Sequence, residues 1–145
     1  MGIRVSMTTT EGIHRPVRRA ALLAVTVVVA GCNGGTVDRH ALAKDGDAVD
    51  SLACEGALLA RDVSSGDSTG VFARVHAGAL ARRASNFADA LSERPTLDQI
   101  EPQVRALGRR SGRIATLLER LHERPTDRSA ARHLVGELSR EGDCR

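Results

Sequence analysis

The feature that most constrains the fold is a heptad repeat in the last third of the chain. Eight positions recur there at alternating spacings of three and four residues, and all but one are apolar. They are Leu97, Ile100, Val104, Leu107, Ser111, Ile114, Leu118 and Leu121. A repeat of this length is typical of a helix that packs against antiparallel neighbours in a bundle or coiled coil. It predicts an all-α domain, and no part of the chain shows the competing alternation of a strand.

A proline leaves the start of this helix open. Thr96 and Gln99 match a capping box, which predicts a helix over 97–124. Pro102 conflicts with that start because it would lie in the second turn, where a proline distorts the helix. The alternatives are a kink at Pro102, or a helix that begins at Glu101 with the proline in its first turn.

Three other segments show the same spacing and predict three more helices, over 47–62, 71–94 and 127–141. The expected buried stripes are Val49, Leu52, Gly56, Leu59 and Val63 in the first, Ala77, Leu80, Ala84, Phe87 and Leu91 in the second, and Ala131, Leu134, Val135 and Leu138 in the last. Phe72 and Val75 are expected to widen the second stripe at its start. Alanines make one side of that helix small, which suits internal packing or the docking of a partner helix.

Short connections predict how the helices are joined. The sequence Glu-Arg-Pro-Thr occurs at 93–96 and again at 123–126. In each copy the proline ends one helix and the threonine is placed to cap the next. Such short corners force neighbouring helices to run antiparallel. We expect residues 47–145 to form an up-down antiparallel four-helix bundle, with Gly142 ending the last helix.

The expected connection between the first two helices contains a motif of hydrolases. Residues 66–70 match G-x-S-x-G, which positions a nucleophile only at a strand-to-helix turn. Because these residues join two helices, we expect a plain loop in which Ser68 or Thr69 caps the second helix. The sequence offers no set of catalytic residues, and we expect neither enzyme activity nor a cofactor.

The N-terminal residues have the marks of an export signal. Residues 1–31 hold four arginines and one acid, and they include an uncharged apolar run at 20–30. A basic stretch, a short apolar stretch and small residues are typical of a secretory signal, for which Met7 is an alternative start. The apolar run is well short of the ~20 residues that a membrane-spanning helix needs.

The end of this signal is more specific. Val29-Ala30-Gly31-Cys32 resembles the lipobox of bacterial lipoproteins. The resemblance implies that residues 1–31 are removed and that Cys32 carries a diacylglycerol. The protein would then be held by membrane lipid on the extracytoplasmic side of the cell membrane. The alternative is plain secretion with an incidental Cys32.

Cysteine usage extends this interpretation. If Cys32 carries lipid, Cys54 and Cys144 remain, and two cysteines outside the cytoplasm most often pair. We expect a Cys54–Cys144 disulfide, with two buried free thiols as the alternative. Residues 32–46 contain glycines and mixed charges without periodicity, so we expect a lipidated N-terminus followed by a flexible tether.

Three histidines are the candidates for a metal or haem site. His76, His122 and His133 fall within about two turns of the same end of the predicted bundle. Neutral imidazoles bind zinc or copper, and Glu119 or Glu137 could complete such a site. The alternative is that the three rings point outward on separate helix faces.

Charge and composition narrow the choice of partner. Residues 32–145 hold 17 basic and 17 acidic side chains, so nucleic acid is not expected as a partner. Arg105, Arg109 and Arg113 form a row that would suit anionic lipid head groups, or else a solvated face balanced by acids. The chain has no Trp, no Tyr and two Phe, which argues against binding by aromatic stacking.

These features together predict a membrane-anchored lipoprotein whose small bundle is a non-enzymatic interaction module at the cell envelope, with an envelope protein as partner. The alternative is a carrier of a small ligand, metal or haem at the bundle end near His76.

Overall fold

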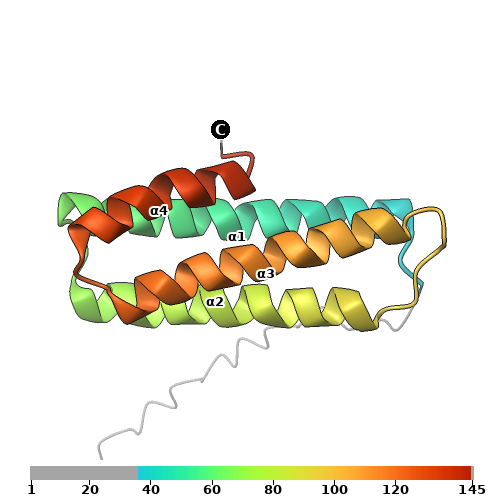
Figure 1. Cartoon of the computed structure of the whole chain (residues 1–145), viewed down its shortest axis with the longest axis horizontal. Coiled ribbons are helices and arrows are strands. Elements are labelled where there is room, and N and C mark those ends of the chain that lie inside the picture. The colour runs from blue at the N-terminus through green and yellow to red at the C-terminus, as the bar shows by residue number, and fades with distance from the viewer. Residues whose placement is uncertain (1–35, 145) are drawn as a thin grey trace, which may run out of the picture. The chain divides into compact units, whose positions relative to one another are not determined.

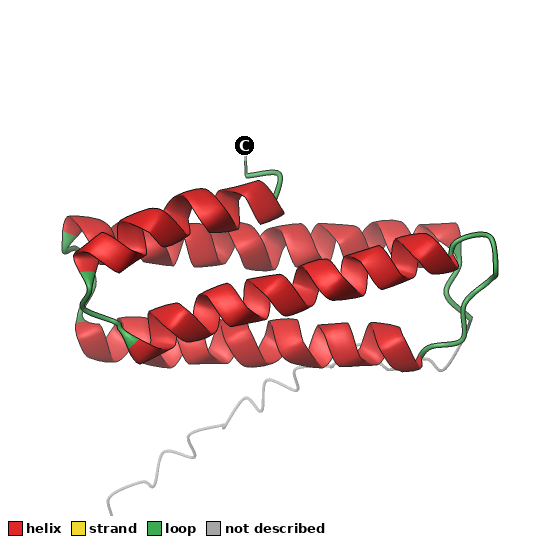
Figure 2. Cartoon of the chain, in the orientation of Figure 1, coloured by secondary structure: helices red, strands yellow, loops and turns green. Residues whose placement is uncertain are grey.

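The computed structural model describes residues 36–144. The predicted leader, the lipobox and Cys32 lie outside the described residues. Within them the chain forms four helices, α1 (Arg39–Ser65), α2 (Gly70–Glu93), α3 (Glu101–Glu123) and α4 (Arg128–Glu141). Successive helices run in opposite directions, as Figures 1 and 2 show. The expected all-α, up-down four-helix bundle is therefore confirmed.

The bundle is built from two closely packed helix pairs. Helix α2 packs mainly against α3, and α1 packs mainly against α4. In Figure 1, α3 runs diagonally between α2 and the α1–α4 pair. One continuous apolar core joins the four helices.

The predicted stripes supply most of this core. All five stripe residues of α1 are buried, as are Ala131, Leu134 and Leu138 of α4 and every heptad position from Ile100 to Leu121. Phe87 and Val135 are partly buried against the same core. The heptad spacing placed the right residues inside because it keeps one side of each helix facing its neighbours.

Small residues bring α2 and α3 together. Ala77 and Ala84 are fully buried, and so is Ser111 at the polar position of the heptad. The Ser111 hydroxyl donates a hydrogen bond to the carbonyl oxygen of Ala84, 2.7 Å away. Because Ser111 is fully buried, a larger side chain at this position would push α2 and α3 apart. The alanine-rich side of α2 therefore serves internal packing.

The first helix begins well before its expected start at residue 47, so the predicted tether over 32–46 is wrong from residue 37 onward. The Asp38 carboxylate accepts a hydrogen bond from the Ala41 N–H at 2.7 Å and caps α1. Val37 is 1% exposed, and its N–H donates to the Pro95 carbonyl at 3.0 Å. Val37 thus contacts a residue that is distant in sequence. The periodicity of neighbouring residues does not reveal such a contact.

In both Glu-Arg-Pro-Thr copies the helix ends at the glutamate, Glu93 or Glu123, as predicted, but neither threonine caps the next helix. Helix α3 begins at Glu101 with Pro102 in its first turn, so the later of the two expected starts is correct and the capping box is not formed. Thr96 instead forms a bridge with Val37. At the second corner Asp127, and not Thr126, caps α4 by accepting from the Ala130 N–H at 2.9 Å.

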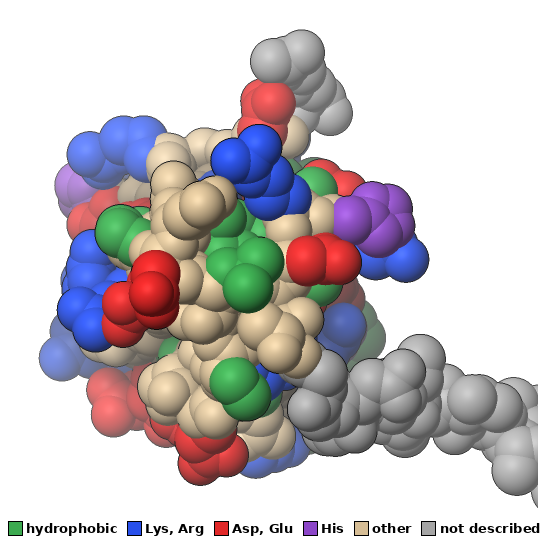
Figure 3. Space-filling model, turned by 90° about the vertical axis from the view of Figure 1, so that its right-hand side faces the viewer, with side chains coloured by type: hydrophobic (Ala, Val, Ile, Leu, Met, Phe, Trp, Pro, Cys, Tyr) green, Lys and Arg blue, Asp and Glu red, His purple; other side chains and the backbone are tan. Residues whose placement is uncertain are grey.

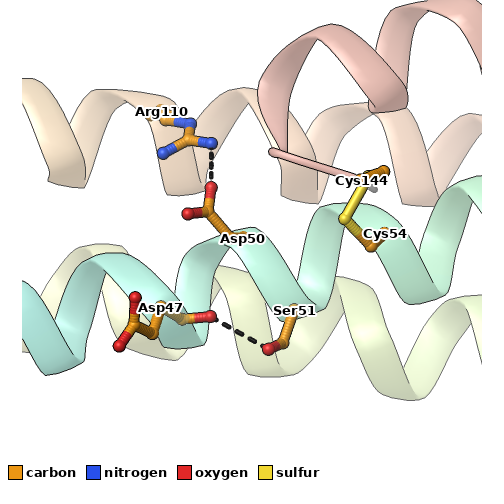
Figure 4. Close-up of a disulfide and its surroundings, with 6 residues drawn as sticks. All are labelled: Asp47, Asp50, Ser51, Cys54, Arg110 and Cys144. Atoms are coloured by element: carbon orange, nitrogen blue, oxygen red, sulfur yellow. Dashed lines mark hydrogen bonds and ion pairs between the residues drawn. A yellow bond between two sulfur atoms is a disulfide. The ribbon is translucent and has the colours of Figure 1, made fainter.

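The end of α4 is fastened to the middle of α1. The sulfur atoms of Cys54 and Cys144 lie at disulfide distance, with their Cα atoms 5.3 Å apart (Figure 4). Gly142 allows this approach, because a Cβ there would lie 2.9 Å from the Ala53 Cβ and 3.0 Å from the Cys54 sulfur. Nearby, Asp50 pairs with Arg110 and links α1 to α3. The expected Cys54–Cys144 pairing agrees with the bundle topology, because α4 runs antiparallel to α1 and brings Cys144 beside Cys54.

Removal of the disulfide should destabilise the bundle. The bridge spans 90 residues, for which the chain-entropy model gives at most about 4–5 kcal/mol. We expect the Cys54→Ser/Cys144→Ser double variant to lose up to that free energy of unfolding, measured by denaturant titration without reductant. Cys144→Ser alone should lose as much, because either change opens the loop. Equal stability of the double variant and the parent would contradict this prediction.

Enlarging the polar heptad position should force α2 and α3 apart. We expect Ser111→Leu to lower the free energy of unfolding by about 1–3 kcal/mol through overpacking and loss of the bond to Ala84. The matched control is Ser85→Leu at an exposed position of α2, which should change stability little. A Ser111→Leu variant with the parent's unfolding midpoint would show that the helices are not held this closely.

Candidate interaction surface

Four large apolar side chains lie exposed at one end of the bundle. Val71 is 77% exposed, Phe72 56% and Val75 66%, all in the first two turns of α2. Leu58 of α1 is 57% exposed and lies about two turns before the connection that leads to α2. We call these four residues the distal apolar surface, because α1 begins at the opposite end of the bundle (Figure 1).

The position of Phe72 and Val75 corrects the sequence prediction, which placed both in the buried stripe. Helix α2 turns its small side, with Ala73, Ala77 and Ala81, toward the core. At about 100° per residue, both Val75 and Phe72 fall on the side of the helix that faces away from Ala77. The predicted stripe of α2 is confirmed from Ala77 onward, since Leu80 and Leu91 are buried, but its expected widening at Phe72 and Val75 is wrong.

A polar cluster borders the distal apolar surface. The His76 Nε2 lies 3.0 Å from a Glu55 carboxylate oxygen, and the Arg83 guanidinium lies 3.8 Å from the other. The His76 ring stacks on Phe72 with the ring centroids 5.4 Å apart. Because α1 and α2 are antiparallel, one turn onward from the Glu55–His76 contact brings Leu58 to the level of Phe72. The apolar and polar parts thus adjoin along both helices.

His122 lies on another side of α2. Its Nδ1–H donates to the Arg74 carbonyl oxygen at 2.8 Å, which joins the end of α3 to the start of α2. Gly78 makes room for this ring, since a Cβ at residue 78 would come within 2.8 Å of the His122 Nδ1. Packing and one hydrogen bond thus account for the position of His122 without a ligand.

The three candidate histidines do not come together. His76 of α2 points toward α1, whereas His122 of α3 points toward α2. His133 of α4 is exposed beside Arg120 and Glu137. Among residues 36–144 no group of three His, Cys, Asp or Glu side chains is placed to hold a metal ion. The prediction that the three histidines lie near the same end of the bundle did not say which way each side chain points, and the three point in different directions.

The expected arginine row is largely paired with acids. Arg105 pairs with Glu101 on the same helix, and Arg113 forms two hydrogen bonds, 2.8 and 2.9 Å long, with the carboxylate of Glu141 on α4. The Arg113 hydrogen bonds lower the pKa of Glu141 and raise the pKa of Arg113. Arg109 is exposed. This pattern favours the interpretation of a charge-balanced face.

Comparison of the chain with protein-family models, with curated proteins and with solved structures finds no match. In the part of the chain that the structure describes, none of the helices combines the length and the apolar character needed to span a bilayer.

The Arg113–Glu141 pair should make stability depend on pH. The lowered pKa of Glu141 means that its contribution is complete above the unfolded-state value and is lost as the pH falls through the folded-state value. We expect Glu141→Gln to cost up to about 1 kcal/mol at pH 7, a cost limited by the exposure of Arg113. The difference from the parent should shrink below about pH 4.5.

The matched control is Glu119→Gln, since Glu119 is exposed and forms no ion pair within residues 36–144. Urea unfolding of both variants between about pH 3 and pH 7 measures the effect. A Glu141→Gln cost that is unchanged across this range would contradict the assignment.

Proposed function

We propose that this protein is an exported bacterial lipoprotein, anchored by acyl chains on Cys32 at the extracytoplasmic side of the cell membrane. Its bundle binds an envelope protein through the distal apolar surface and performs no chemistry of its own. The observation that carries the binding role is the exposure of Leu58, Val71, Phe72 and Val75 at one end of an otherwise charge-balanced bundle.

The cysteines support the anchor. Cys54 and Cys144 lie at disulfide distance, and disulfides persist mainly outside the cytoplasm. Cys32 is the remaining cysteine of the chain and directly follows Val29-Ala30-Gly31, the part of the sequence that resembles a lipobox. The disulfide distance and the lipobox resemblance independently favour a location on the extracytoplasmic side of the membrane.

The composition of the distal apolar surface supports a protein partner. Exposed large apolar side chains that cluster and are bordered by polar groups are typical of protein interaction sites. Here the border is supplied by Glu55, His76 and Arg83, which carry groups of both signs and can fix the orientation of a partner. The Phe72 ring, stacked on His76, would be the anchor residue.

Metabolic labelling tests the anchor. Cells that express the full chain are grown with an alkyne analogue of palmitate, and the purified protein is reacted with an azide dye. We expect label on the parent and none on Cys32→Ser. Cys144→Ser is the matched control, because it removes a cysteine but leaves the lipobox, and it should be labelled like the parent. An unlabelled parent chain would overturn the anchor.

Photo-crosslinking in cells tests the binding surface. A benzoylphenylalanine at position 72 is compared with one at Asp89, which is exposed between four and five turns along the same helix. We expect one discrete adduct from position 72 and none from position 89. Val75→Asp should reduce the adduct about tenfold, the effect of losing an interface residue worth ~1.4 kcal/mol. Equal adducts from both positions, or an adduct insensitive to Val75→Asp, would contradict the proposal.

A further inference from the structure

The short connection between Cys32 and the bundle carries an inference about orientation. Four residues separate Cys32 from Val37, so the two Cα atoms can be at most about 18 Å apart. Val37 is buried, hydrogen bonds to Pro95 and forms a bridge with Thr96. A lipid on Cys32 would therefore hold one particular end of the bundle, the end that carries the 94–100 connection, close to the bilayer.

That end offers an apolar side chain to the lipid. Leu97 follows Thr96 directly and is 51% exposed, although the heptad pattern predicts it to be buried. It lies outside α3, because Pro102 moves the start of the helix to Glu101. Within residues 36–144, the bundle thus exposes one large apolar residue beside the point where the chain leaves toward Cys32, and its other exposed large apolar residues lie at the opposite end.

Charges at this end oppose strong attraction to anionic lipid. Figure 3 looks onto the end and shows hydrophobic side chains near its middle with charged side chains of both signs around them. The charged residues in the adjoining turns and connection are Asp38, Arg39, Glu93, Arg94, Asp98 and Glu101. Arg94 pairs with Asp45 at 3.1 Å. Contact with the bilayer therefore depends on apolar insertion and the anchor, and a zwitterionic surface suffices.

We propose that the 94–100 connection docks on the lipid surface with Leu97 inserted at the interface, so that the bundle stands on end. This inference rests on the proposed acylation of Cys32. Helix α2 runs from Glu93 at the docked end to Phe72 at the far end, a rise of about 30 Å. The distal apolar surface is then held away from the lipid, where an envelope protein can reach it.

Single tryptophans test the orientation, because the chain has no Trp or Tyr of its own. The full chain with Leu97→Trp, and the matched control with Phe72→Trp, are expressed in bacteria, purified from membranes and reconstituted into phosphatidylcholine vesicles with brominated acyl chains. Both sites are exposed, so neither change disturbs the core. We expect the bromolipid to quench the tryptophan at position 97 at least about twofold and to leave the one at position 72 unquenched, since an apolar group at the interface reaches the acyl boundary.

The outcomes separate this inference from the proposed function. Mass spectrometry of the same samples reports acylation of Cys32. An acylated chain in which position 97 is quenched no more than position 72 overturns the orientation and leaves the anchor standing. Quenching of both positions to the same extent shows a bundle lying flat and also overturns it. A chain without acyl groups overturns the anchor and this inference together.

Discussion

Close contact between α2 and α3 determines which side of α2 is buried and which side is exposed. The contact uses small residues, with Ala84 and Ser111 fully buried and joined by a hydrogen bond. Because α2 gives its small side to α3, its large apolar residues Phe72 and Val75 lie on sides that no other described helix covers. An amphipathic helix usually buries its largest apolar residues. Helix α2 does so farther along, where Leu80 and Leu91 are buried, so the exposure of Phe72 and Val75 follows from the side of the helix on which they lie.

The other helix pair meets a different constraint, since α4 is much shorter than α1. Helix α4 has 14 residues and α1 has 27, so α4 covers only part of its partner. The end of α4 is held by the Cys54–Cys144 pair and by Glu141 with Arg113. The first half of α1 is held by Val49 in the apolar core and by ion pairs from Asp45 and Asp50 to arginines of other elements. Each half of α1 thus has its own set of attachments.

The fold could be predicted from the sequence because its main signals are local and repeated. Heptad spacing marks the buried positions of α3, and the short corners determine that neighbours are antiparallel, which in turn brings Cys144 to the level of Cys54. The Ala130–Asp127 cap and the start at Glu101 are also local signals, although the sequence offers competing choices at both places.

The surface could not be predicted in the same way, because it depends on contacts between residues distant in sequence. The burial of Val37 just before α1 depends on its contact with Pro95 and Thr96, more than 50 residues later in the chain. Whether Phe72 is buried depends on which side of α2 meets α3, and both sides carry apolar residues. The direction of His76, toward Glu55, depends on the register between α1 and α2. Periodicity identifies the buried side of a helix only where one side is clearly more apolar than the other.

The long-range contact at Val37 has a consequence for the proposed function that a free tether would not have. A tether over 32–46 would let the bundle turn freely above the membrane, so either end could face the lipid. With the chain held at Val37, four residues remain between the bundle and Cys32. An anchor on Cys32 then selects one end for the lipid and leaves the other for a partner. The apolar residues are divided in the same way, with Leu97 at one end and Phe72 at the other. In the proposed arrangement each exposed apolar site would have its own kind of partner, a lipid interface near the anchor and a protein at the far end.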